Sequence, residues 1–138
     1  MIILDTNVVS ELSRPKVSEV VLRWFDAQPL PSIYFTAISL AEVLAGLSTM
    51  PEGKRKSLLT KDMQKLIGGL FGPRILPFDE SAAQAYAEIA RSCFAKGRPL
   101  PQSDAQIAAI AKANGFAVAT RDVKPFEAAG VDVINPWA

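Results

Sequence analysis

The sequence predicts an α/β protein, a three-layer α/β/α sandwich with a central parallel sheet of about five short strands. Two observations favour this fold class. Short runs of β-branched and aromatic residues alternate along the chain with longer segments whose apolar residues recur every three or four positions. The first run, residues 2–4, is apolar without alternation, which suits a strand buried on both faces of a parallel sheet. Strands that alternate with helices favour parallel pairing with helices on both faces.

The composition is that of one globular domain, which we expect to extend over residues 1–138. Hydrophobic residues make up 49% and charged residues 21% of the chain, which argues against disorder. No apolar run approaches the length of a membrane span and the N-terminus lacks a signal-peptide pattern, so we expect a cytoplasmic protein with no membrane partner. The net charge of +1 neither requires nor forbids a nucleic-acid partner.

Two residue types restrict the chemistry. The single cysteine, Cys93, excludes an internal disulfide and lies in an apolar helical stretch, where we expect it to pack in the core. The chain contains no histidine, which excludes Ser-His-Asp and Cys-His catalysis and the usual zinc sites. Any enzymatic chemistry must therefore depend on carboxylates, lysine, hydroxyl groups or a metal ion bound by oxygen.

The first half of the chain alternates two predicted strands with four predicted helices. The strands are residues 2–4 and 33–35, and the helices are residues 8–13, 17–27, 39–47 and 54–67. Thr6 and Asn7 are good N-cap types for the first helix, and Thr36 or Ser39 can cap the third. Glycines 68, 69 and 72 are expected to close the fourth.

The second half continues the alternation. The predicted strands are residues 74–77, 116–119 and 131–134, and the predicted helices are residues 80–95, 105–113 and a helical turn at 126–129. Asp79 is a suitable N-cap and Gly97 a suitable terminator for the first of these helices. Ser103 and Gln106 have the spacing of a capping box that would open the next helix.

Four acidic residues occupy equivalent positions in this pattern. Asp5 follows the first strand, Glu42 lies early in the helix after the second, Asp104 opens a helix, and Asp122 follows the fourth strand. Because ligand sites in open α/β sheets lie at the carboxyl ends of the strands, the four carboxylates can meet in one cleft. Taken singly, each is explained as well by a helix cap, a capping box, a helix dipole or a turn.

Four carboxylates in one cleft would repel each other and keep some of their protons unless a cation neutralised them. Mg²⁺ and Mn²⁺ prefer oxygen ligands, and Mg²⁺ retains several of its waters. Such an ion lowers the pKa of bound water and stabilises charge on a phosphoryl oxygen. Composition and spacing together therefore indicate a metal-dependent phosphodiester hydrolase.

Four motifs in this order resemble those of the PIN-domain ribonucleases, and more narrowly the VapC and FitB toxins of bacterial toxin–antitoxin pairs. They are MIILDTN at residues 1–7, SLAEVLAG around Glu42, SDAQIAAIA around Asp104 and ATRD at residues 119–122. The resemblance extends over the whole chain, including LPFDE at residues 76–80 and NPW at residues 135–137.

The resemblance implies a PIN-like sandwich and a metal-dependent ribonuclease. Asp5, Glu42, Asp104 and Asp122 match the acidic quartet that holds Mg²⁺ or Mn²⁺, Thr6 and Asn7 match the support of the first acid, and Thr120 matches a hydroxyl residue near the fourth. Asp5 and Asp104 would be the principal metal ligands, with Glu42 and Asp122 acting partly through water. The implied partners are an RNA substrate, a second copy of the chain, and a small DNA-binding antitoxin whose tail occupies the cleft.

An RNA substrate also needs cations for its phosphates. The candidates near the acidic residues are Arg121, Lys124, Lys96 and Arg98. The basic run at residues 54–56 is better explained as a solvated helix start. Trp24 and Trp137 are expected to pack rather than to stack on bases.

Three alternatives remain open at the level of sequence. A phosphatase of the haloacid dehalogenase type also begins with a strand and an aspartate, but it needs a second aspartate where this chain has Asn7. A protein- or nucleic-acid-binding module with a PIN-like fold would need no intact quartet. A metal-dependent DNA nuclease would share the acidic site but would need further DNA-binding elements.

Overall fold

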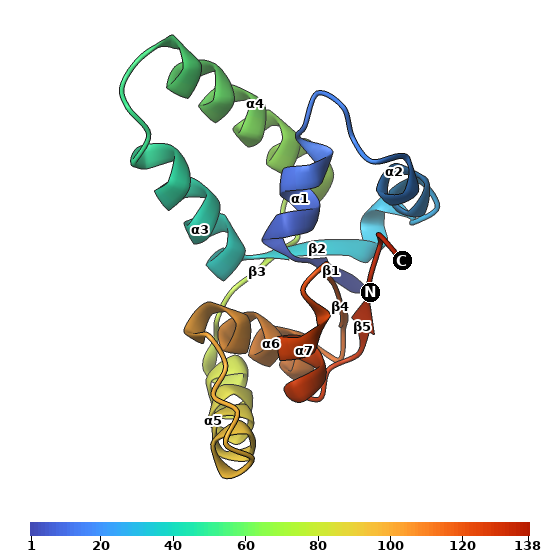
Figure 1. The fold of residues 1–138 in the computed structure, drawn as a ribbon, viewed down its shortest axis with the longest axis vertical. Helices are drawn as coiled ribbons and strands as arrows, with labels where there is room; N and C mark the ends of the chain where they lie inside the picture. Colours follow the sequence, from blue (N-terminus) through green and yellow to red (C-terminus); the bar gives the residue numbers. More distant parts are fainter.

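Five short strands form one parallel sheet in the computed structural model, which describes residues 1–138 (Figure 1). The strands are β1 (Ile2–Leu4), β2 (Ile33–Thr36), β3 (Ile75–Leu76), β4 (Ala117–Ala119) and β5 (Val133–Ile134). Their order across the sheet is β3-β2-β1-β4-β5, and all four pairings are parallel. In the register of the central strand, Ile2 lies opposite Ile33 on one side and Ala117 on the other.

Helices cover both faces of this sheet, which confirms the predicted α/β/α sandwich. The first group is α1 (Thr6–Leu12), α2 (Glu19–Asp26), α3 (Ala37–Ser48) and α4 (Lys54–Phe71), and the second is α5 (Glu80–Ala95), α6 (Gln102–Asn114) and α7 (Val123–Ala128). A short 3-10 helix, η1 (Leu30–Ser32), precedes β2 and was not predicted. In Figure 1, α1, α3 and α4 lie above the sheet, and α5, α6 and α7 lie below it. None of the helices combines the length and apolarity that crossing a membrane requires.

The core is divided by the sheet into two clusters, and β1 contributes to both. Ile3 packs into the cluster formed with α5, α6 and α7. Leu4 packs into the cluster formed with α1, β2, α3 and α4. Both side chains are fully buried, as predicted for an apolar strand without alternation. Cys93 also lies buried in the first cluster, as expected.

Two predicted helix starts were wrong. In α1, the N-cap is Asp5, whose side chain accepts a hydrogen bond from the backbone nitrogen of Thr6, so Thr6 and Asn7 belong to the first turn. In α6, the predicted capping box is absent and the N-cap is Pro101. The extended backbone of Pro101 aims its carbonyl at the backbone nitrogen of Ala105, 3.0 Å away, and this bond starts the helix three residues before the predicted first residue.

The end of α4 also differs from the prediction. The helix continues through Gly68 and Gly69 to Phe71 and ends at Gly72, which has a φ of +52°. Phe71 is fully buried, and its ring stacks on that of Phe35 with centroids 4.8 Å apart. Burial of an aromatic ring stabilises the fold by more than two helical glycines cost, so packing overrides local propensity here.

Candidate active site

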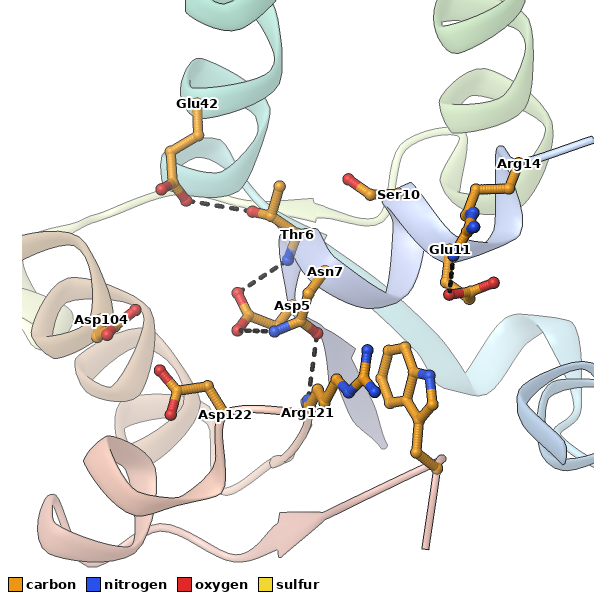
Figure 2. A pocket seen from close by; sticks show the side chains of 11 residues that line it. Asp5, Thr6, Asn7, Ser10, Glu11, Arg14, Glu42, Asp104, Arg121 and Asp122 are labelled. Atoms are coloured by element: carbon orange, nitrogen blue, oxygen red, sulfur yellow. Dashed lines mark hydrogen bonds and ion pairs between the residues drawn. The ribbon is translucent and has the colours of Figure 1, made fainter. Parts of the chain in front are cut away.

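A cleft of about 600 Å³ opens at the carboxyl ends of β1 and β4 (Figure 2). It lies where the chain leaves these strands for α1 and α7, with α3 and α6 contributing from either side. Its lining is almost entirely polar or charged and consists of Asp5, Thr6, Asn7, Ser10, Glu11, Arg14, Glu42, Asp104, Arg121, Asp122 and Trp137. All four acidic residues singled out in the sequence therefore line one cleft.

Asp5 is held at the base of the cleft by three hydrogen-bond donors. Its backbone nitrogen continues the β1–β4 ladder by donating to the carbonyl of Ala119 at 2.9 Å. Oδ1 accepts from the backbone nitrogen of Thr6 at 2.8 Å, and Oδ2 accepts from the Thr120 hydroxyl at 2.9 Å and the Asn7 amide at 3.4 Å. Only 7% of Asp5 is exposed, so its carboxylate has little freedom to turn away from the cleft.

Thr120 connects the two strand ends beneath the cleft. This fully buried residue donates to Asp5 and accepts from the Asn7 amide and from the backbone nitrogen of Asp122, both at 3.1 Å. The Asn7 carbonyl oxygen in turn accepts from the backbone nitrogen of Arg121 at 3.2 Å. These contacts fix the turn after β4 against the start of α1.

Glu42 reaches the cleft from the second turn of α3. Thr36 caps this helix by accepting from the backbone nitrogen of Ser39 at 3.0 Å, so Glu42 is not the partner in a capping box that began at Ser39. Its Oε1 instead accepts from the Thr6 hydroxyl at 3.1 Å. Contact between α3 and the first turn of α1 thereby orients Glu42 toward the other acids.

The remaining two acids have little part in capping. Asp122 occupies the N-cap position of α7 but makes no capping hydrogen bond. Asp104 lies in the first turn of α6, where a negative charge is favoured by the helix dipole. In Figure 2 both carboxylates face the space beside Asp5. Of the four acids, only Asp5 accepts a capping hydrogen bond.

The environment of the cleft disfavours the ionised form of two of its carboxyl groups, those of Asp104 and Asp5. Partial burial, followed by the charges of Asp5, Asp122 and Glu42, raises the pKa of Asp104 from 3.8 to about 6. Burial also raises the pKa of Asp5, although the hydrogen bonds from Thr120 and Thr6 act in the opposite direction. Like charges this close favour either retained protons or a bound cation.

The donor set fits a divalent ion that prefers oxygen. Carboxylate oxygens are ligands that suit Mg²⁺ and Mn²⁺, and the cleft offers no nitrogen or sulfur ligand. No three of the acidic side chains converge tightly enough to surround an ion by themselves. An ion here would keep waters in its coordination shell, as Mg²⁺ usually does.

The candidate RNA-binding cations are divided between two places. Arg121 lines the acidic cleft. Lys96, Arg98 and Lys124 line a separate hollow of about 660 Å³ beside α5 and α7. In the basic run that begins α4, Lys54 and Arg55 are exposed and Lys56 pairs with Glu52 at 2.6 Å, which agrees with its interpretation as a solvated helix start.

The sequence interpretation overlooked one face of α1. Ser10 and Glu11 line the cleft together with Asn7, and their spacing of three and four residues from Asn7 is the signal that places them on one face of the helix. Arg14 lies two residues beyond the end of α1 and lines the cleft as well. Glu11 is buried and accepts from Arg14 at 3.3 Å and from the backbone nitrogen of Ser18 at 3.1 Å. It thereby attaches the loop before α2 to the rim of the cleft.

The two tryptophans differ in their roles. Trp24 packs against the core beside α1 to α4, as predicted. Trp137 also packs there, but it lines the cleft as well, with the Arg121 guanidinium carbon 5.2 Å from its ring centroid. The prediction of a packing role for Trp137 was therefore incomplete.

The fold and the site define an α/β/α protein with an acidic cleft at the carboxyl ends of its central strands. The sequence model of the PIN domain matches residues 2–131, and the chain belongs to this family. Membership removes the haloacid dehalogenase alternative.

Its relatives identify the branch of the family. The chain is 44% identical to VapC ribonuclease Y4jK of Sinorhizobium fredii over 99% of this chain and 98% of that protein. It is 50% identical to plasmid stability protein StbB of Pseudomonas syringae pv. tomato over 99% of both chains. It is also 44% identical to toxin FitB of Neisseria gonorrhoeae over 99% of both.

Solved structures agree with this assignment. The crystal structure of FitAcB from Neisseria gonorrhoeae, 44% identical in sequence, matches with a TM-score of 0.92 over 99% of both chains. The structure of FitAB bound to a DNA fragment, also 44% identical, matches with a TM-score of 0.93 over 100% of this chain and 96% of that one. The chain is thus a PIN-domain toxin of the VapC and FitB type, as its motifs predicted.

Proposed function

We propose that this protein is the toxin of a type II toxin–antitoxin pair and hydrolyses RNA phosphodiester bonds with Mg²⁺ or Mn²⁺ held by Asp5, Glu42, Asp104 and Asp122. The observation that carries the proposal is the convergence of four carboxylates, from four separate elements, on one polar cleft. The raised pKa of Asp104 supports it, because a bound cation would offset the burial and the like charges that disfavour the ionised form of this side chain.

The ligands would have unequal roles. Asp5 and Asp104 would bind the ion most directly, and Glu42 and Asp122 would complete the site partly through water. When bound, the ion supplies positive charge for the phosphoryl oxygens and lowers the pKa of an attacking water.

The protein's own residues prepare the site for that ion. Thr120 and the backbone of Thr6 donate to the two oxygens of Asp5, which favours its ionised form and opposes the effect of burial on its pKa. The Thr6 hydroxyl fixes the side chain of Glu42. Because these donors are already in place, little reorganisation would accompany binding of the ion or of substrate.

The proposal includes partners. A relative of known structure is FitAB bound to DNA, and we expect this chain to pair likewise with a small DNA-binding antitoxin. Five carboxylates line the cleft against two arginines, so a basic antitoxin tail would neutralise it. The family resemblance also implies a homodimer, and cleavage of cellular RNA would take place in the cytoplasm.

Cleavage of a mixed RNA pool by the purified protein tests the proposal. We expect Mg²⁺ or Mn²⁺ to support cutting, and EDTA or Asp5→Asn to abolish it. Asp132→Asn is the matched control, because Asp132 is an exposed aspartate outside the cleft.

Single- and double-stranded DNA belong in the same assay, since preferential cutting of DNA would indicate a DNA nuclease. Wild type that neither cuts RNA nor binds metal would indicate a non-catalytic binding module.

A further inference from the structure

Two arginines line the acidic cleft, and they differ in whether a carboxylate pairs with them. Arg14 forms an ion pair with Glu11 at 3.3 Å. Arg121 forms none, since the only other ion pair in the chain joins Lys56 to Glu52. Arg121 is therefore the one cation of the cleft that is not already neutralised by a carboxylate.

The turn after β4 explains why Arg121 avoids the acids beside it. The backbone nitrogen of Arg121 donates to Asn7, and that of Asp122 donates to Thr120. With the turn fixed in this way, consecutive side chains leave it in opposite directions. Figure 2 shows Asp122 directed toward Asp104, and Arg121 extended the other way along the cleft.

Trp137 receives the Arg121 side chain. The guanidinium carbon lies 5.2 Å from the indole ring centroid, within the range of a cation–π interaction. The indole is itself held, because the backbone nitrogen of Trp137 donates to the Asn135 side chain at 3.0 Å and its ring packs on the core. A guanidinium that contacts an aromatic ring through its face keeps the N–H donors in its plane free.

We propose that Arg121, oriented by Trp137, binds a backbone phosphate of the RNA strand whose neighbouring phosphodiester lies among the four carboxylates. This inference rests on the proposed ribonuclease function and names the contact that positions its substrate. A guanidinium with free in-plane donors matches two phosphate oxygens at once. Trp137 is the positioning residue, because it acts on RNA through Arg121.

The charge of the cleft also favours this role for Arg121. An RNA strand that enters the cleft meets Asp5, Glu42, Asp104 and Asp122, and even a bound divalent cation offsets only half of their charge when all are ionised. A cation at the other end of the cleft compensates for the phosphates that flank the cleaved bond. Arg14 cannot serve without giving up Glu11, whereas Arg121 gives up no ion pair.

The test measures binding of a short fluorescent single-stranded RNA of mixed sequence, by anisotropy, over a range of salt concentrations. Asp5→Asn is the background, so that Mg²⁺ is present without cleavage. Arg121→Ala and Arg121→Lys are compared with Arg91→Ala, which removes an equal charge from the exposed surface of α5. Trp137→Leu is compared with Trp137→Phe, which retains an aromatic face.

We expect Arg121→Ala to weaken binding about tenfold and to lower the slope of log affinity against log salt by about 0.7, the value for one lost phosphate contact. Arg121→Lys should restore the slope but not all of the affinity. Trp137→Leu should weaken binding about threefold with an unchanged slope, and Trp137→Phe should rescue part of it. Arg91→Ala should match the background.

Other outcomes overturn the inference in distinguishable ways. If wild type cleaves RNA but Arg121→Ala and Arg91→Ala bind alike, the phosphate contact is refuted and the proposed function stands. If wild type neither binds nor cleaves RNA, both fail together. If Arg121→Ala binds RNA normally but binds the antitoxin less tightly, Arg121 belongs to the protein interface instead.

Discussion

Replacing Asp104 with asparagine should stabilise the metal-free protein while it abolishes cleavage. The substitution keeps the size of the side chain and removes one of four negative charges from the cleft. Its neighbours and partial burial raise the pKa of Asp104 from 3.8 to about 6, which corresponds to about 3 kcal/mol at neutral pH. Because the side chain is half exposed, solvent screening reduces this upper bound to about 1 kcal/mol.

The sign of the effect changes with pH in a defined way. A carboxyl group whose pKa is higher in the folded state destabilises that state as the pH rises from the unfolded-state pKa to the folded-state pKa, and the effect is constant above the latter. The gain from Asp104→Asn should therefore be complete at pH 7.5, most of its full size near pH 6, about half as large near pH 5 and nearly absent at about pH 3. At pH 7.5 it should raise the melting temperature in EDTA by about 3–5 °C.

In Mg²⁺, wild type should be more stable than Asp104→Asn, the reverse of the order expected in EDTA. At about 100 times its Kd, the ion would stabilise wild type by about 2.7 kcal/mol, whereas Asp104→Asn has lost a principal ligand. Thermal unfolding with EDTA and with Mg²⁺, at several pH values, measures both effects, and Asp132→Asn is the control for removal of an exposed charge. A variant that is no more stable than wild type in EDTA, or a gain independent of pH, would refute the repulsion argument.

Three further predictions concern two residues that hold the site in place and one that packs in the core. Thr120→Val removes the hydroxyl that donates to Asp5, so it should cost about 1–3 kcal/mol of unfolding free energy and most of the cleavage rate, as measured by urea unfolding and RNA cleavage. Thr36→Ala removes the N-cap of α3 and should cost about 1 kcal/mol, with a smaller loss of activity through Glu42, measured by the same two assays. Phe71→Ala should cost about 3–5 kcal/mol in urea unfolding, because its ring is fully buried against Phe35.

Conservative variants provide the controls. Thr120→Ser and Thr36→Ser keep the hydroxyl and should retain stability and most of the activity, and Phe71→Leu should lose less than Phe71→Ala. Equal losses in Thr120→Ser and Thr120→Val would show that the methyl group matters rather than the hydrogen bonds. Full stability of Thr36→Ala would contradict the capping role, and a cost below about 1 kcal/mol for Phe71→Ala would contradict its place in the core.

The fold class was predictable because β1 and its neighbours carry an unambiguous pattern. A strand of three consecutive apolar residues must be covered on both faces, and the burial of Ile3 and Leu4 in separate clusters is the result. Helix ends were less predictable. Local propensity favoured Ser103 as a cap and the glycines after residue 67 as a stop, but Pro101 and the burial of Phe71 prevailed.

The candidate site also has a part that could be predicted from the sequence and a part that could not. The positions of Asp5, Glu42 and Asp122 followed from their places after strands or near helix starts, and the cleft does contain them with Asp104. Trp137 could not be placed there from spacing, because its position depends on the tertiary path of the last residues past Arg121. The side chains of Lys96 and Arg98 were expected near the acids, but the helix they follow directs them into a separate hollow.

The strand order 3-2-1-4-5 has a consequence for the timing of synthesis. The first strand made is the central one, and it pairs on one side with β4, the fourth strand to leave the ribosome. Until residues 117–122 emerge, Asp5 lacks the Thr120 hydroxyl, Asp122 is missing, and one edge of β1 has no neighbour. A growing chain therefore cannot assemble the cleft before residue 122 has emerged, and until then a cell that translates this protein is not exposed to a complete site.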